Sequence, residues 1–255
     1  MTTDALIDAL GARRGIVCAV GAGGKKTTLY ALARAHAGRV GLTATVFTAK
    51  FPRRLGAREV ISGTAALAEA VAAAAADARI VAWARPSDKP GRVAGLEPDE
   101  VAPCHAAGGF DVTLVKADGA RMRGIKAPRE DEPRVAAGTT TLLPIVSAAV
   151  IGRPLDERVA HRPERVADVT GLAHGDRITP EAVGRLLASP RGALQGTADG
   201  MTVVPVLNAV DDASARRVAT EAAQAALAAS DRFTRVVLTR HRRDASWFEV
   251  IERDR

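Results

Sequence analysis

The fold class of this chain is decided by the stretch Gly15-Ile16-Val17-Cys18-Ala19-Val20-Gly21-Ala22-Gly23-Gly24-Lys25-Lys26-Thr27-Thr28. An apolar run gives way to glycines and then to a helical pattern that carries lysine and threonine at its start. This order is typical of a phosphate-binding loop, in which glycines let backbone N–H groups surround an anion and the helix N-terminus adds its dipole. Lysine supplies positive charge and threonine a ligand for Mg²⁺. The sequence therefore predicts a nucleotide, ATP or GTP, bound with Mg²⁺.

Two alignments with the pattern G-x-x-x-x-G-K-[ST] are open. Pairing Gly24 with Lys25 places Ala19 in the first glycine slot and Lys26 in the hydroxyl slot. We favour Lys26 with Thr27 as metal ligand, because a lysine directly before a hydroxyl serves both charge neutralisation and metal coordination; Lys25 is then an extra cation. An ordinary glycine-rich turn would explain the glycines, but not two lysines followed by two threonines. The predicted nucleotide contacts are Gly21, Ala22, Gly23, Gly24, Lys25, Lys26, Thr27 and Thr28.

Length and composition favour a globular α/β protein. With 255 residues and 47% hydrophobic content, the chain is long enough to bury a full core. We expect residues 1–255 to form a single P-loop-like α/β domain, with a small helical insert over residues 156–195. Residues 1–6 lack a basic leader, and every later apolar run is broken before 18 residues, so we expect a cytoplasmic protein with no membrane segment. Cys18 and Cys104 suit reduced core positions, and Cys104 beside His105 is weak support for a metal.

The net charge of +7 raises the question of nucleic-acid binding. Its basic residues are mostly scattered arginines, and aromatic residues make up only 3%, so stacking platforms for single strands are scarce. We therefore expect no nucleic-acid partner and keep nucleic-acid binding as the weakest alternative. Part of the charge can serve to attract a polyanionic nucleotide.

Strand and helix patterns alternate along the chain, as in a mostly parallel sheet flanked by helices with a P-loop NTPase-like fold. Helices are predicted over residues 26–37, 64–77, 163–169 and 179–187, and strands over 39–46, 79–84, 110–117, 201–207, 235–239 and 247–251. The end of the second strand carries polar side chains at a sheet edge where ligands bind. Ordinary β propensity explains the threonines equally well. These side chains are Thr43, Thr45, Thr48 and Lys50.

Asp118 follows an apolar strand and precedes Gly119. Many nucleotide hydrolases place at such a strand end the carboxylate that holds Mg²⁺ or its water. An Asp-Gly turn is also common without any function. Because parallel strands end at the same sheet edge, we expect Asp118 near the end of the first strand and predict it as catalytic and metal-binding, together with Thr27 as metal ligand.

Asn208 and Asp211 close the strand over residues 201–207. They resemble the N-K-x-D signature by which GTP-binding proteins read guanine, with Ala209 in place of the lysine. Both are therefore predicted nucleotide contacts. The alternative is structural: Asp211 or Asp212 is a natural N-cap for the alanine-rich helix that ends near Ala229.

Taken together, these motifs resemble the YqeC-type accessory proteins of selenium-dependent molybdenum hydroxylases. The resemblance runs in order from about residue 15 to 211. It implies a P-loop nucleotide-binding protein whose partner is such a hydroxylase or its cofactor intermediate. The residues that carry it are Gly21-Ala22-Gly23-Gly24-Lys25, Thr27-Thr28, Ala117-Asp118-Gly119-Ala120, Lys126-Ala127-Pro128, Glu132-Pro133, His161-Arg162-Pro163-Glu164, Leu207-Asn208 and Asp211.

The resemblance also implies roles for His161 and Arg162. A histidine titrates near neutrality and an arginine binds oxyanions in a bidentate manner, so both are predicted as catalytic with Lys26. The alternative is a loop that starts a helix at Pro163. This chain departs from the usual family form in its doubled lysine, in Lys116 where that form has an acidic residue, and in Ala44 within the threonine run.

No nucleophile or general base stands out in the sequence. Two function classes therefore remain: an enzyme that hydrolyses the nucleotide or transfers a phosphoryl or nucleotidyl group, and a nucleotide-gated module that delivers cofactor without turnover.

Overall fold

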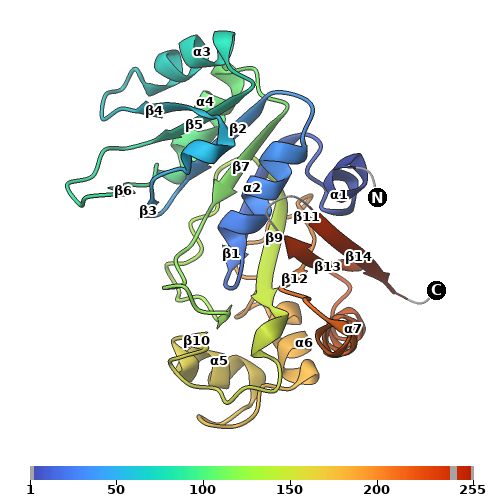
Figure 1. Ribbon diagram of the computed structural model, residues 1–255. Coiled ribbons are helices and arrows are strands. Elements are labelled where there is room, and N and C mark those ends of the chain that lie inside the picture. Colours follow the sequence, from blue (N-terminus) through green and yellow to red (C-terminus); the bar gives the residue numbers. More distant parts are fainter. Residues whose placement is uncertain (1–2, 242–245, 254–255) are drawn as a thin grey trace. The chain divides into compact units, whose positions relative to one another are not determined.

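The computed structural model describes residues 3–241 and 246–253. Backbone contacts divide the chain into two compact units. The first unit comprises the chain up to Ala19 with Leu29–Gly119 and Arg134–Thr141; the second comprises Val20–Thr28, Ala120–Pro133 and the chain from Leu142 onward. Met1 and Thr2, on which the expectation of no leader partly rests, lie outside the described residues. Each unit combines mostly parallel strands with flanking helices, which confirms the predicted α/β class (Figure 1).

The first unit contains a parallel sheet of buried aliphatic strands. Its order is β1-β7-β2-β5-β4, and every neighbouring pair is parallel. Continuous apolar runs are typical of strands that are covered on both faces. Ala19 pairs with Lys116, so β1 and β7 end at the same edge of the sheet, as predicted. The bounds are β1 (Gly15–Gly21), β2 (Val40–Ala44), β4 (Arg58–Ile61), β5 (Ile80–Ala84) and β7 (Val112–Lys116).

Helices and short segments complete the first unit. Helix α3 packs against α4 and against β4 and β5. The short strand β6 pairs antiparallel with β3. Trp83 is fully buried and stacks on Phe110 with ring centroids 5.3 Å apart. The bounds are α1 (Thr3–Ala9), α2 (Lys25–Ala35, whose first turn belongs to the second unit), β3 (Thr48–Ala49), the 3-10 turns Arg53–Leu55 and Pro98–Glu100, α3 (Leu67–Asp77), β6 (Arg92–Val93) and α4 (Val101–Ala107).

The second unit has a sheet in the order β9-β12-β13-β14. The first three strands are parallel, and β14 is antiparallel to β13. The single strand predicted over residues 201–207 is instead two short strands, because Pro205 has no N–H for a ladder and interrupts the pairing. The bounds are β9 (Thr139–Ser147), β11 (Thr202–Val203), β12 (Val206–Asn208), β13 (Arg235–His241) and β14 (Ser246–Glu252).

Three helices and a small ribbon pack in the second unit. Helix α6 packs closely on α7, where a Cβ at Gly184 would lie 2.6 Å from that of Ala225. Helix α5 packs on α6 and on β8, which pairs in parallel with β10. Asp212 caps α7 by accepting a hydrogen bond from Ala215 N at 2.8 Å, which settles the choice between Asp211 and Asp212 as N-cap. The bounds are β8 (Ile125–Lys126), the 3-10 turn Ala148–Val150, β10 (Ala160–His161), α5 (Pro163–Thr170), α6 (Pro180–Ala188) and α7 (Ala213–Ala229).

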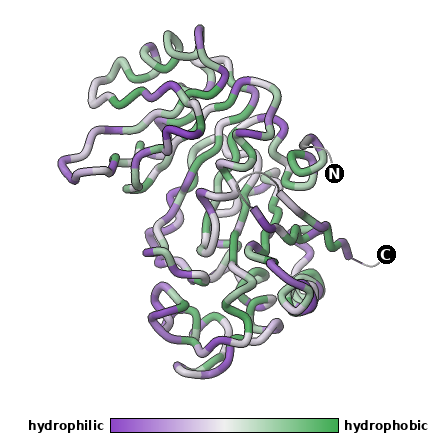
Figure 2. The backbone as a smooth tube through the Cα atoms, viewed as in Figure 1, coloured by the Kyte–Doolittle hydropathy of each residue, from purple (hydrophilic) through white to green (hydrophobic). Residues whose placement is uncertain are grey.

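Hydrophobic residues follow the strands of both units (Figure 2). Val17, Cys18 and Ala19 in β1 are fully buried, as the apolar run predicts. Burial raises the pKa of the Cys18 thiol to about 11, so this cysteine stays protonated at neutral pH, in keeping with a core position. In the described part of the chain, no helix has the length and apolar character required to cross a membrane.

Candidate functional site

The glycine loop (residues 21–24) connects β1 to α2 in the second unit. Gly21, Gly23 and Gly24 have φ values of +84°, +85° and +146°, which residues with a Cβ rarely adopt. Space is also lacking: a Cβ would lie 2.4 Å from the carbonyl oxygen of Ile145 at Gly21 and 2.5 Å from Ser147 Cβ at Gly23. Both backbone shape and packing therefore require glycine here.

Neutral hydrogen bonds fix the glycine loop. Ala22 N donates to the Ile145 carbonyl oxygen at 2.7 Å. On the other side, Asn208 Nδ2 donates to the Gly23 carbonyl oxygen at 2.9 Å. The Oδ1 atom of Asn208 in turn accepts from the buried Thr239 hydroxyl at 3.0 Å. A chain of buried polar groups thus connects the loop to β12 and β13.

The lysines and threonines after the loop differ in exposure. Lys25 is buried, with 6% of its surface exposed, and its ammonium group donates to the Gly21 carbonyl oxygen. Lys26 is partly buried and Thr27 is exposed. Thr28 is fully buried, and its hydroxyl has no hydrogen-bond partner among the described residues. That Lys26 contacts the phosphates and Thr27 the metal stays a prediction. Of the two lysines, Lys25 is the one whose ammonium group bonds to the loop.

A second segment, Ala120–Pro133, contacts the glycine loop through Gly124. The Gly124 carbonyl oxygen accepts a hydrogen bond from Ser147 N at 2.9 Å. The same oxygen would lie 2.8 Å from a Cβ added at Gly23. Directly after Gly124, β8 carries Lys126, which lies opposite His161 of β10. The loop, β8 and β10 are therefore neighbours within one unit.

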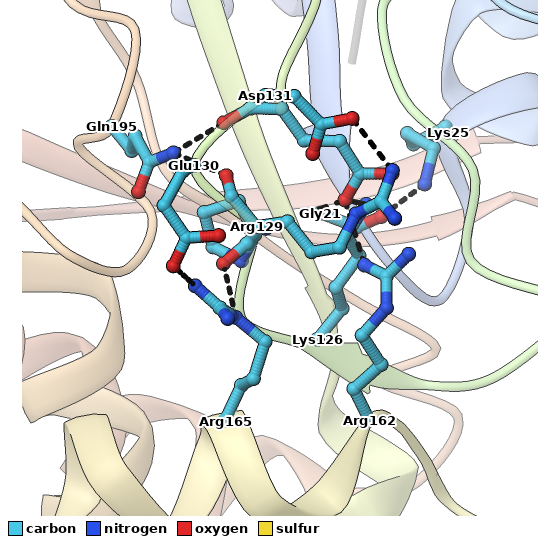
Figure 3. Close-up of polar contacts among 11 residues, drawn as sticks. Gly21, Lys25, Lys126, Arg129, Glu130, Asp131, Arg162, Arg165 and Gln195 are labelled. Carbon is cyan, nitrogen blue, oxygen red and sulfur yellow. Dashed lines mark hydrogen bonds and ion pairs between the residues drawn. The ribbon is translucent and has the colours of Figure 1, made fainter.

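Glu132 forms ion pairs with Lys126 of the same segment and with Arg162, which precedes α5. Its Oε2 atom accepts from both Lys126 Nζ and Arg162 Nη1, each at 2.8 Å (Figure 3). Burial opposes ionisation of Glu132, but the hydrogen bonds from Arg162 and Lys126 outweigh it and lower its pKa to about 2. Burial and the positive charges of Arg162, Lys126 and Arg121 lower the pKa of His161 to about 4. The imidazole is consequently neutral at pH 7, while the glutamate is ionised.

The strap (residues 128–132) is fastened to the helical part of the unit by side chains that reach its backbone. Arg165 Nε donates to the Pro128 carbonyl oxygen at 2.8 Å, and Gln195 Nε2 donates to the carbonyl oxygens of Arg129 and Glu132 (Figure 3). Arg165 also pairs with Glu130 at 2.6 Å. Residues from the predicted insert therefore hold the strap in place.

Asp118 belongs to the first unit, where it follows β7 and is 1% exposed. Lys116 donates to its carbonyl oxygen at 2.7 Å. The hydroxyls of Thr43 and Thr45 donate to the carbonyl oxygens of Trp83 and Arg134 at 2.7 and 2.5 Å. These two threonines thus have a structural use, whereas Asp118 as a metal ligand stays a prediction.

Comparison with known proteins gives the family. The model of the YqeC protein family matches residues 17–164, which is more than half of the 255 residues. The chain belongs to the YqeC family. It is 27% identical over 118 residues to "Uncharacterized protein YqeC" of Escherichia coli (strain K12), and this stretch covers 46% of the chain and 46% of that relative. The match thus spans less than half the length of the curated relative. No solved structure matches the chain.

The part that matches the YqeC family contains the glycine loop, Glu132, His161 and Arg162. Asn208 and Asp211 lie after it. The amide of Asn208 contacts the loop on one side and Thr239 on the other, which is a positioning contact that the resemblance to N-K-x-D did not suggest. Asp211 is exposed, and base recognition by it stays a prediction.

Sequence reasoning missed the residues that support the site in this YqeC-family chain. Glu132 stands out in the sequence only as part of a motif, and Ser147 and Thr239 give no signal because they lie in ordinary strands. Metal ligation by Cys104 and His105 has no support: no group of three or more His, Cys, Asp or Glu side chains among residues 3–241 and 246–253 could hold an ion. His105 Nδ1 instead shares a hydrogen bond with the Thr113 hydroxyl at 2.8 Å.

Proposed function

We propose that this chain binds the phosphates of a nucleotide, ATP or GTP with Mg²⁺, at the glycine loop, and acts as an accessory protein in the maturation of a selenium-dependent molybdenum hydroxylase. The geometry of the loop supports the nucleotide, and the resemblance to YqeC-type accessory proteins supports the pathway. One observation carries the proposal: three glycines with positive φ lead directly into a helix whose first residue is the buried Lys25.

The start of α2 offers the contacts that a phosphate needs. Its first intrahelical bond runs from Thr28 N to the Gly24 carbonyl oxygen, and the N–H groups of the first turn precede that bond. Helix N-termini of this kind bind anions through N–H groups and the helix dipole. The Lys25 ammonium would exchange the Gly21 carbonyl oxygen for a charged phosphate oxygen, which is the stronger acceptor.

The side chains present also fit a phosphate with its metal. A buried hydroxyl normally has a hydrogen-bond partner, and a bound phosphate or an ordered water would supply one for Thr28. The exposed Thr27 hydroxyl would hold Mg²⁺. When bound, Mg²⁺ would neutralise charge on the phosphates. Lys26 would add a further cation beside Lys25.

Calorimetric titration with ADP and with GDP, each with Mg²⁺, tests the proposal. Each charge-assisted hydrogen bond is worth about 1.5–3 kcal/mol, so we expect the Lys25→Ala/Lys26→Ala variant to bind at least about 100-fold more weakly. The matched control is Arg34→Ala, which removes an exposed positive charge from the same helix and should leave the affinity unchanged. Absence of binding at millimolar nucleotide, or equal binding by both lysine variant and wild type, would refute the proposal.

Phosphate-release assays on the wild type and the lysine variant distinguish an enzyme from a nucleotide-gated delivery module. Release of phosphate from ATP or GTP that disappears in the lysine variant would identify an enzyme. Binding without lysine-dependent release would identify a nucleotide-gated delivery module. Tighter binding of GDP than ADP, abolished by Asp211→Ala, would assign base recognition to Asp211.

A further inference from the structure

The cluster of Lys126, Glu132, His161 and Arg162 contains more positive than negative charge. Lys126 and Arg162 share one oxygen atom of one carboxylate, so the three ionised groups sum to a single positive charge. The positive charge of Arg121 also contributes to the lowered pKa of His161. A cluster of this composition suits an anionic ligand, because a second negatively charged group would neutralise the remaining positive charge of Lys126 and Arg162.

The cluster is layered from the interior outward. The Lys126 side chain is fully buried, whereas 22% of Arg162 and 14% of Glu132 is exposed. His161 is partly buried, and no hydrogen bond to its imidazole occurs in the part of the chain that the structure describes. A ligand would therefore meet Arg162 and His161 first, with the Lys126 charge behind them.

The backbone at Arg162 is held in an uncommon conformation. Its φ of +63° lies in the left-handed region, and it occupies the N-cap of α5 without capping the helix through its side chain. Pro163 follows as the first helical residue. Non-glycine residues in this region cluster at ligand sites, where the surrounding structure fixes a side chain in a functional position.

The cluster also lies close to the glycine loop. The carbonyl oxygen of Gly124 is packed against Gly23 and bonded to Ser147. Lys126 follows two residues later, in β8. A group bound at the cluster would thus lie beside a phosphate bound at the loop.

We propose that Lys126, His161 and Arg162 form an oxyanion subsite next to the glycine loop, with Glu132 as the internal counter-ion that holds the two cations in place. The inference deepens the proposed function and rests on it for the identity of the neighbouring ligand. Two sources share this chemistry: the terminal phosphate of the bound nucleotide, and an oxyanion of a separate acceptor substrate. Arg162 and His161 bind the oxyanion directly, and Glu132 is a positioning residue.

Orthophosphate is the probe, titrated at constant ionic strength into the protein saturated with ADP and Mg²⁺. We expect Arg162→Gln to weaken phosphate binding at least about tenfold. The matched control is Arg158→Gln, which removes the same charge from an exposed position three residues before His161. An equal loss in both variants, or no loss in Arg162→Gln, would overturn the subsite.

A second readout follows the imidazole of His161 by NMR, with His161→Gln to assign its signal. A bound oxyanion offsets the charges of Arg162, Lys126 and Arg121, while Glu132 stays in contact with Arg162 and Lys126. We therefore expect the pKa of His161 to rise from about 4 when phosphate is saturating. An unchanged pKa at saturating phosphate would place the ion elsewhere.

Two further experiments distinguish the nucleotide's terminal phosphate from a separate acceptor, and the oxyanion subsite from the proposed nucleotide site. A triphosphate analogue with a β,γ-imido bridge should exclude orthophosphate if the subsite takes the terminal phosphate, and admit it if the subsite takes a separate acceptor. Either result supports the subsite. If no nucleotide binds but phosphate binding to the protein alone still depends on Arg162, the subsite stands and the proposed function fails. If phosphate binding is lost in Lys25→Ala/Lys26→Ala and retained in Arg162→Gln, the ion binds the loop and the subsite is refuted.

Discussion

The glycine loop and the strap belong to the same unit but are held by different forces. The loop is fixed by neutral hydrogen bonds and close packing, from Ala22 to Ile145 and from Asn208 to Gly23. The strap is fixed by hydrogen bonds from Arg165 and Gln195 to its backbone and also by ion pairs, of which the two to Glu132 are the least exposed. The contacts from Ile145 and Asn208 that fix the loop are thus neutral, whereas ion pairs contribute to holding the strap.

This difference suits the two segments to different tasks. A loop shaped by neutral contacts can present N–H groups to a phosphate before the ligand arrives, so little reorganisation is needed on binding. A cluster whose ion pairs leave a net positive charge can take up an external oxyanion while its internal carboxylate stays bound. The loop is therefore the rigid element, and the ion pairs of the strap are the adjustable one.

The largest expected effect comes from removing the Glu132 charge. In Glu132→Gln, the buried Lys126 and the partly buried Arg162 lose their shared carboxylate, and loss of one partner from a buried pair typically costs about 3 kcal/mol or more. We expect a lower free energy of unfolding in urea at pH 7. Glu130→Gln is the control, because it removes the exposed carboxylate from the same strap and should change the stability little. Similar losses in both variants would contradict a special role for Glu132.

The contribution of Glu132 also depends on pH in a defined direction. Its pKa is about 2 in the folded protein against an ordinary value of 4.5, so the folded state favours the ionised form. The stabilisation is fully present above pH 4.5 and is lost as the pH falls toward 2. The difference in unfolding free energy between wild type and Glu132→Gln should therefore shrink over that interval.

A smaller effect is expected when the glycine loop is distorted. In Gly23→Ala, the new Cβ would lie 2.5 Å from Ser147 Cβ at a φ of +85°. Gly152→Ala is a matched control, since Gly152 has a φ of +84° and a Cβ added there would meet no atom within 4 Å among the described residues. The cost of placing alanine at a positive φ, about 1 kcal/mol of unfolding free energy, is common to both variants. Overpacking should lower the unfolding free energy by about 2 kcal/mol more at Gly23 only. Equal unfolding free energies for the two variants would show that the loop yields easily.

Local sequence patterns predicted most of the fold. The buried runs of β1, β2 and β5 are continuous and apolar, and the switch from glycines to Lys25 marks a helix start in any context. The two-residue strands β3, β6, β8 and β10 were not predicted, because so short a segment has no periodicity. Their pairing depends on residues distant in the chain, as when Lys126 meets His161.

The site was predictable to the extent that its chemistry lies within one short stretch. The glycines and lysines are adjacent in sequence, so their motif was visible. Asn208 contacts Gly23 across 185 positions, and its neighbours suggested base recognition rather than loop support. Glu132 and Arg162 lie 30 positions apart, and only the fold shows that they share an ion pair with Lys126.

The smallest expected effect concerns Asn208, whose side-chain amide bonds to a loop carbonyl. Asn208→Ala removes the donor to Gly23 and the acceptor for Thr239, which should cost about 1–2 kcal/mol of unfolding free energy. Thr239→Val, which keeps the shape and loses only the second bond, should cost less.

Nucleotide titration of Asn208→Ala sharpens the comparison further. If Asn208 only positions the loop, its loss weakens ADP and GDP by the same factor, because both share the phosphates and differ in the base. A loss confined to GDP would mean that the amide reads guanine, and the contact with Gly23 would then be one that the ligand replaces. In that case the ligand would replace a neutral contact of the loop, the loop would rearrange on binding, and the distinction between a rigid loop and an adjustable strap would fail.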